Sequence, residues 1–443
     1  METLFNDGVT PKKFYKFVWP SVLMMIVIAL YYGIDSILVS NLAGETALAA
    51  LSIAYPVQGL MWGVSVMFAA GSSAIVAINM GEGDQDKANE RFSLVCVLSI
   101  LMGIAFTAAN FIFMDQIIDF LGATDALKQN CYDFLNIFAW SYPAAFVGLI
   151  FEYYIRIEGD PGFTLFLYLF NGFVHLAVAY ICIGPMDMGI SGAAYGNLAG
   201  LVVMAVIGWL YFIIKKTKLK FRRFRYHAGF VGHCFVNGSS ELVTEASAGI
   251  TTFFFNIVVI DLAGEVGVAA VSIVLNVHYL FISLHLGFIM GVAPLLSYYY
   301  GAKDYDKVNI FIRYSRNFIL VASVAGAVLC LAFANVIVMA FESPGTELYD
   351  IALEGTRLLS IALLMCGFNV YASGFFTAYG NGIISALIST SRALVMVIAG
   401  MYLLAWLFGI TGVWLTLTFA EVTTMGLTFG MLIKYKSVYN YKL

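Results

Sequence analysis

Several ionisable side chains lie inside long apolar stretches of this sequence, where a charge is costly. Asp35 lies more than four fifths of the way along the first stretch, residues 14–39, and Glu245 lies nearly three turns into the seventh, residues 235–260. A carboxylate at the centre of a bilayer costs about 2.5–3.5 kcal/mol on insertion scales, so such a residue is a functional candidate by default. The chemistry that fits is reversible binding of a coupling ion or of an organic cation.

Neighbouring residues strengthen the case for Asp35. Tyr31 lies one helical turn before it, so one helix face combines a carboxylate with an aromatic ring. Pro20 lies inside the same apolar run and would permit a kink. The alternative interpretation is a carboxylate near the interface that water can reach and the fold merely tolerates.

Other polar residues pair at helical spacing. Glu152 and Arg156 lie four positions apart near the end of the fourth stretch, and they suit either a gate or a structural ion pair. His278 and His285 are seven positions apart, but two histidines without a third ligand are poor evidence for zinc. The six cysteines show no short paired spacing. We therefore expect no metal site and no disulfide framework.

Composition identifies a polytopic membrane protein. The 443 residues are 61% hydrophobic and only 11% charged, and the mean hydropathy is +0.88. A soluble domain has roughly 25% charged residues. No soluble stretch is long enough for a nucleic-acid-binding module. No phosphate loop, nucleophile elbow or metal-ligand cluster is present, so the sequence does not indicate an enzyme or a cofactor.

A scan for apolar stretches of about 20 residues, the length that crosses a bilayer, predicts an all-α protein with twelve transmembrane helices. They lie near residues 14–39, 48–79, 92–114, 131–154, 163–183, 190–214, 235–260, 266–298, 311–341, 354–378, 384–407 and 411–433.

The distribution of basic residues predicts the orientation. If the N-terminus is cytoplasmic, all but three of the 23 Lys and Arg residues are cytoplasmic or lie at that end of a span; the exceptions are Lys128, Arg357 and Arg392. The positive-inside rule therefore predicts a multi-pass protein of the cytoplasmic membrane with both termini in the cytoplasm.

An internal repeat divides the chain into halves. LAGETALAALSI from Leu42 recurs as LAGEVGVAAVSI from Leu262, with eight of twelve positions identical, and GEGDQDKAN from Gly81 recurs at the same offset as GAKDYDKVN from Gly301. Six spans per copy give both halves the same orientation, related by a pseudo-two-fold axis along the membrane normal. We predict bundles at 1–214 and 229–443 with a basic cytoplasmic connector at 215–228, as in an alternating-access carrier.

These motifs resemble those of the multidrug and toxic compound extrusion (MATE) transporters over essentially the whole chain. The resemblance depends on IDSILVSNLAGETALAALSI, GAAYGNLAG, VAAVSI, PLLSYYYGAKDYDKVN and GVWLTLTFAE in this order, and it is strongest for the prokaryotic DinF-like and MepA-like branches. It implies two six-helix bundles forming a V, and export driven by protons or sodium ions.

The resemblance also implies site residues. Similar members carry an acid at the position of Asp35, at the same spacing from a proline matching Pro20, and a cation site completed by residues matching Asn171, His175 and Asn197. The family pattern has Asp where this chain has His175. Imidazole removes a sodium ligand and gains or loses a proton near neutral pH, which favours protons.

Members also commonly carry an essential acid in the seventh helix, which implies a role for Glu245. Glu241, one turn earlier, lies nearer the end of the span and is either interfacial or part of the same site. Glu421, in TFAE, matches a recurring family position and suits packing or function equally.

The resulting hypothesis is a monomeric secondary antiporter that exports lipophilic, cationic compounds by alternating access. Protons are the favoured coupling ion and sodium is the alternative. Methionines such as Met25 and Met290 could line an adaptable apolar pocket. The rival is a flippase for a lipid-linked saccharide, which would need a basic cavity that only Arg357 and Arg392 could supply. A lipid-modifying enzyme and a passive channel fit less well.

Overall fold

The computed structural model describes residue 5 and residues 8–442, and in this part of the chain the regular secondary structure is all helical, without strands. The all-α prediction is confirmed. The α-helices are α1 Pro11–Ala43, α2 Glu45–Gly81, α3 Gln85–Ile112, α4 Met114–Phe120, α5 Asp125–Phe138, α6 Tyr142–Glu158, α7 Pro161–Ile183, α8 Ile190–Ile214, α9 Ala228–Gly301, α10 Tyr305–Ala332, α11 Ala334–Met339, α12 Glu347–Ala378, α13 Gly382–Thr390 and α14 Met396–Tyr435. A π-helical turn, η3 Ser391–Val395, joins α13 to α14.

Ten helical segments in the described part of the chain are long and apolar enough to cross a membrane. Two of them cross twice. The 74 residues of α9 would span about 110 Å if straight, several times the bilayer core of about 30 Å. Instead, α9 breaks at Gly264 and α14 at Gly409, both with φ of 60°, a conformation that glycine adopts readily. The twelve predicted crossings are confirmed.

The offset of the sequence repeat also relates turns of the backbone in the two halves of the chain. Gly44 and Gly264 occupy equivalent positions of the two copies and both have positive φ, at 86° and 60°. The equivalent pair Gly189 and Gly409 does as well, at 55° and 60°. Each of these glycines lies between two successive crossings. The same turns therefore occur at equivalent places in the N-terminal bundle, α1–α8, and the C-terminal bundle, α9–α14.

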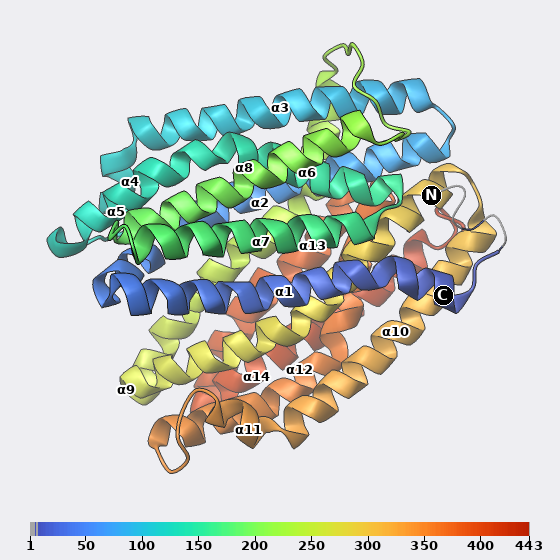
Figure 1. Cartoon of the computed structure of the whole chain (residues 1–443). Coiled ribbons are helices and arrows are strands. Elements are labelled where there is room, and N and C mark those ends of the chain that lie inside the picture. Colours follow the sequence, from blue (N-terminus) through green and yellow to red (C-terminus); the bar gives the residue numbers. More distant parts are fainter. Residues whose placement is uncertain (1–4, 6–7, 443) are drawn as a thin grey trace.

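Both chain ends lie at one end of the molecule, which we call the terminal face (Figure 1). Residues 215–227, between α8 and α9, are not helical and run along α3 at this face. The backbone N–H of Lys220 donates to Asn89 Oδ1 at 2.9 Å, and that of Arg222 donates to Ser93 Oγ at 2.8 Å. These bonds attach the connector to the N-terminal bundle.

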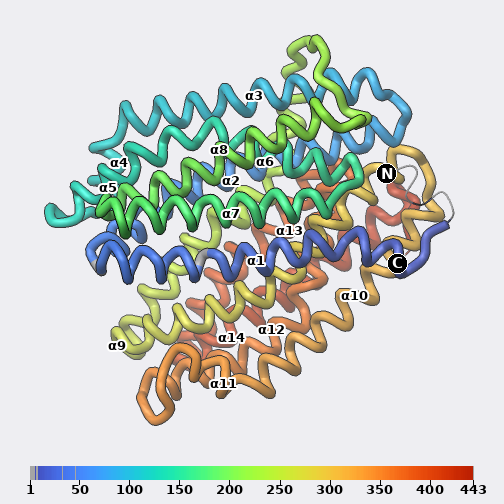
Figure 2. The backbone as a smooth tube through the Cα atoms, in the orientation of Figure 1, coloured from blue at the N-terminus to red at the C-terminus, as the bar shows by residue number. Residues whose placement is uncertain are grey.

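The two bundles pack tightly at the terminal face. A Cβ on Gly71 of α2 would lie 2.0 Å from the carbonyl oxygen of Cys234 in α9. Asn237 Nδ2 donates to the Gly71 carbonyl at 3.2 Å, and the ring of Phe14 in α1 stacks on Phe311 in α10 with centroids 5.7 Å apart. Towards the opposite end, which we call the far face, the helices of the two bundles diverge (Figure 2).

Gly71→Leu is expected to prevent the two bundles from packing against each other at the terminal face. The new side chain would overlap the α9 backbone, because no space exists for even a Cβ there. Cys234 is fully buried, so we expect its labelling by N-ethylmaleimide, located by mass spectrometry, to rise about tenfold or more as the terminal face opens. Gly59→Leu is the matched control, since a Cβ on Gly59 of the same helix meets nothing within 4 Å. Equal labelling of Cys234 in both variants would contradict the packing argument.

Candidate functional site

Asp35 and His175 form a buried pair inside the N-terminal bundle. Asp35 Oδ1 of α1 lies 2.8 Å from His175 Nε2 of α7, and the two residues are 6% and 3% exposed. The ring of Tyr31 packs edge-on against the imidazole with centroids 5.2 Å apart. A carboxylate and an imidazole at hydrogen-bond distance share a proton and can take up another, so the pair is chemically suited to proton binding.

The two asparagines implied by the resemblance lie nearby but make other contacts. Asn171, one turn before His175, faces α8, because a Cβ on Gly200 would lie 2.5 Å from Asn171 Oδ1. Asn197 Nδ2 donates to the carbonyl of Ala193 in its own helix at 3.2 Å. Within the described residues, neither asparagine is hydrogen-bonded to Asp35. Of the four residues predicted for this site, the structure therefore brings Asp35 and His175 into direct contact.

A central cavity of about 120 Å³ lies between the two bundles. Both bundles contribute to its wall, which is mainly apolar and aromatic. Its lining residues are Met25, Ile28, Trp62, Val66, Leu149, Glu152, Tyr153 and Tyr168 from the N-terminal bundle, and Glu241, Thr244, Glu245, Tyr279, Leu286, Ile289, Met290, Val370, Ser373, Gly374, Ser389 and Arg392 from the C-terminal bundle. This lining suits an organic molecule with an apolar body.

Glu241 and Glu245 lie on one face of α9 and both reach the cavity. Glu245 is exposed and Glu241 half-buried, although both lie well inside a membrane-crossing segment. At this depth in the membrane, the exposed part of Glu245 lies in the wall of the central cavity. The structure thus places both predicted acids of the seventh span at one site. Asp35, in contrast, is not among the lining residues.

Glu152 and Arg156 form a buried ion pair one turn apart on α6, each residue 1% exposed. The Arg156 guanidinium lies over the ring of Tyr153, 4.4 Å from its centroid. Glu152 lines the central cavity, and Arg156 lines a second cavity of about 60 Å³. Tyr153 and Glu241 line both cavities, so the pair lies where the two spaces meet.

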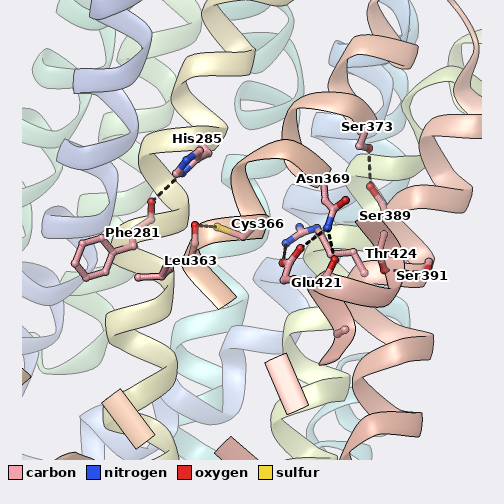
Figure 3. A network of polar contacts seen from close by, with 12 residues as sticks. Phe281, His285, Leu363, Cys366, Asn369, Ser373, Ser389, Ser391, Glu421 and Thr424 are labelled. Carbon is pink, nitrogen blue, oxygen red and sulfur yellow. Dashed lines mark hydrogen bonds and ion pairs between the residues drawn. The ribbon is translucent and has the colours of Figure 1, made fainter. Parts of the chain in front are cut away.

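The C-terminal bundle contains its own buried polar network (Figure 3). Glu421 Oε1 accepts from Arg392 at 3.2 Å, and Glu421 Oε2 accepts from Asn369 at 2.7 Å. Glu421 is 3% exposed and does not line the central cavity. The contacts of Glu421 in this network are compatible with a role in packing and with a role in function.

The two histidines of α9 lie apart from this network. His285 Nε2 lies 3.2 Å from Ser323 Oγ, and His278 Nε2 is buried without a hydrogen-bond partner. Among residue 5 and residues 8–442, no group of three His, Cys, Asp or Glu side chains is arranged to hold a metal ion.

Arg392 belongs to the cavity wall, although the sequence suggests it only as a source of positive field for a flippase. An arginine inside an apolar stretch is itself a signal of function. Its pairing with Glu421, however, depends on how η3 and α14 pack. The membership of Tyr153 and Trp62 in the cavity wall has no local sequence signal.

The chain is similar to drug transporters over nearly its full length. The MatE family model matches residues 20–181 and 243–403. The multidrug export protein MepA of Staphylococcus haemolyticus is 22% identical over 408 residues, 90% of this chain and 88% of that protein. MepA of Staphylococcus saprophyticus is 23% identical over 430 residues, 94% and 92% of the two chains. A multidrug resistance MATE family transporter of the MOP superfamily, solved in an outward-facing conformation, matches with a TM-score of 0.91 at 22% identity, covering 98% of this chain and 97% of its own.

Proposed function

Because this chain belongs to the MatE family of multidrug exporters, which are transporters and not enzymes, we propose that it exchanges protons for lipophilic organic cations across the cytoplasmic membrane. The observation that carries the proposal is the separation of two sites. A buried Asp35–His175 pair lies in the N-terminal bundle, and a cavity lined by Glu241 and Glu245 lies between the bundles.

The buried pair suits a proton better than a sodium ion. Sodium needs several oxygen ligands, and one of the groups closest to Asp35 is an imidazole nitrogen 2.8 Å away. A protonated imidazole would repel a metal cation, whereas the same imidazole stabilises a proton held by the pair. No cofactor is needed for this exchange.

The cavity suits a cation with an apolar body. Glu241 and Glu245 supply negative charge, and Trp62, Tyr168 and Tyr279 supply aromatic faces that attract organic cations. Because a single chain forms the whole cavity, we propose that the transporter acts as a monomer.

Helix α1 connects the two sites. Met25 and Ile28 line the cavity, and Asp35 lies two to three turns further along the same helix, which continues unbroken through Pro20. A proton that changes the contact of Asp35 with α7 would shift the cavity wall through α1. Pro20 provides a position at which the helix can bend, because it donates no backbone hydrogen bond.

We propose that both termini are cytoplasmic, so the tightly packed terminal face closes the cytoplasmic side and the far face points outwards. Similarity to a transporter solved in an outward-facing conformation supports this assignment. The bundles would then rock about the cavity to open the terminal face.

Transport of rhodamine 123, a permanent cation, into proteoliposomes tests the function. We expect an imposed proton gradient to drive accumulation of the dye and a sodium gradient to have no effect. Accumulation with sodium alone would overturn the choice of proton, and failure of both gradients would overturn the antiporter assignment.

A further inference from the structure

Arg392 brings a guanidinium into a cavity whose other charged side chains are carboxylates. It is the one basic residue among the described residues of the wall, which also holds Glu152, Glu241 and Glu245. Glu152 is already neutralised by Arg156. The cavity therefore presents two carboxylates on α9 that have no ion-pair partner among the described residues, and a guanidinium on η3 that is already paired with Glu421.

Residues outside the cavity wall hold the guanidinium of Arg392 in place. Glu421 accepts one hydrogen bond from its Nη1 at 3.2 Å, and Asn369 Nδ2 donates to the other carboxylate oxygen of Glu421. Asn369 is itself bonded to the hydroxyl of Thr428, whose Oγ1 donates to Asn369 Oδ1 at 2.8 Å. Figure 3 shows Asn369 and Glu421 side by side in this network. An arginine anchored in this way keeps a fixed orientation.

The anchoring leaves binding capacity on the cavity side. A guanidinium has five N–H donors in a planar fork, and the bond to Glu421 occupies one of them. Since Arg392 also lines the cavity, donors remain for an acceptor inside it. Such a fork matches the two oxygens of a carboxylate.

The backbone around Arg392 is irregular. It belongs to the π-helical turn Ser391–Val395 between α13 and α14, and the hydroxyl of Ser391 is bonded to Thr424 Oγ1 at 3.0 Å. Single π-helical turns inside α-helices are frequent at functional sites.

We propose that Arg392 binds the acidic group of zwitterionic substrates, so that the cavity selects organic compounds carrying both a cationic and a carboxylate group. The inference rests on the proposed function and adds a second point of recognition to it. Glu241 and Glu245 would face the cationic end, and Arg392 the carboxylate. A compound with a cationic group alone would contact the acids of α9 and leave the donors of Arg392 unused.

Two dyes that differ in one group test the inference. Rhodamine 110 has a free carboxylate and is a zwitterion, whereas its methyl ester rhodamine 123 is a monocation. We expect wild-type proteoliposomes to transport both, and Arg392→Gln to lower the ratio of rhodamine 110 to rhodamine 123 transport about tenfold or more, the magnitude of a charge-assisted hydrogen bond. Rhodamine 123 transport should change little, because this dye has no free carboxylate for Arg392 to bind.

Arg392→Gln leaves Glu421 buried without its partner, which can impair folding. The double variant Arg392→Gln with Glu421→Gln removes both charges and should show the same change in ratio. Fluorescence polarisation of both dyes with purified protein provides a second measurement, in which the affinity for rhodamine 110 should fall selectively.

Three results would separate the explanations. Equal loss of both dyes in both variants would mean that Arg392 is structural, and would overturn the inference. Wild-type transport of rhodamine 123 without rhodamine 110 would overturn the inference alone. Wild-type transport of neither dye would overturn the proposed function together with it.

Discussion

Replacing Asp35 by Asn is expected to stop proton-driven export while leaving the fold and dye binding intact. The substitution changes one carboxylate oxygen to an amide nitrogen. The new side chain can still accept a hydrogen bond from His175, which lies 2.8 Å from the carboxylate, but it cannot take up a proton. Coupling free energies of about 1–3 kcal/mol correspond to changes of about 5- to 150-fold, and we expect a loss of proton-driven rhodamine 123 transport on the order of 100-fold.

The measurement is dye accumulation in proteoliposomes with an imposed proton gradient, together with dye affinity by fluorescence polarisation. Asp119→Asn is the matched control, because Asp119 is 64% exposed and pairs with Lys128 at the far face. Normal transport by Asp35→Asn would remove the N-terminal pair from the mechanism. Loss of dye binding would instead place Asp35 in the substrate site.

The architecture could be predicted from the sequence because its signals are local. Hydropathy predicts the crossings, and the gaps between its predicted spans contain Gly264 and Gly409, where the backbone of α9 and α14 turns. Helical spacing also places Glu241 and Glu245 on one face. These features depend on residues close together in the chain.

Contacts between helices that are far apart in the sequence could not be predicted and are known only from the structure. Spacing puts Asn171 and His175 on one face of α7, but it cannot show that only His175 reaches Asp35, 140 residues earlier. Likewise, the density of acids in the spans indicates an acidic cavity, while the position of Arg392 in its wall depends on the π-helical turn at 391–395. No local pattern predicts that turn.

Substituting the two acids of α9 is expected to weaken substrate binding and not ion coupling. Glu245 is exposed to the central cavity and Glu241 lies one turn away in the same wall. A charge-assisted hydrogen bond contributes about 1.5–3 kcal/mol, equivalent to roughly tenfold to hundredfold in affinity. We therefore expect Glu245→Gln to raise the Kd for rhodamine 123 about tenfold, and the double variant with Glu241→Gln to raise it further.

Affinity and rate separate this prediction from that for Asp35. At saturating dye, Glu245→Gln should retain proton-driven transport, since the Asp35–His175 pair is intact, whereas Asp35→Asn should stay inactive at any dye concentration. Glu347→Gln is the control, because Glu347 is exposed in the first turn of α12 and outside the cavity wall. If Glu245→Gln lowered the saturated rate without changing the Kd, the seventh-span acid would be the coupling group. Ion coupling would then take place in the C-terminal bundle and not in the N-terminal bundle.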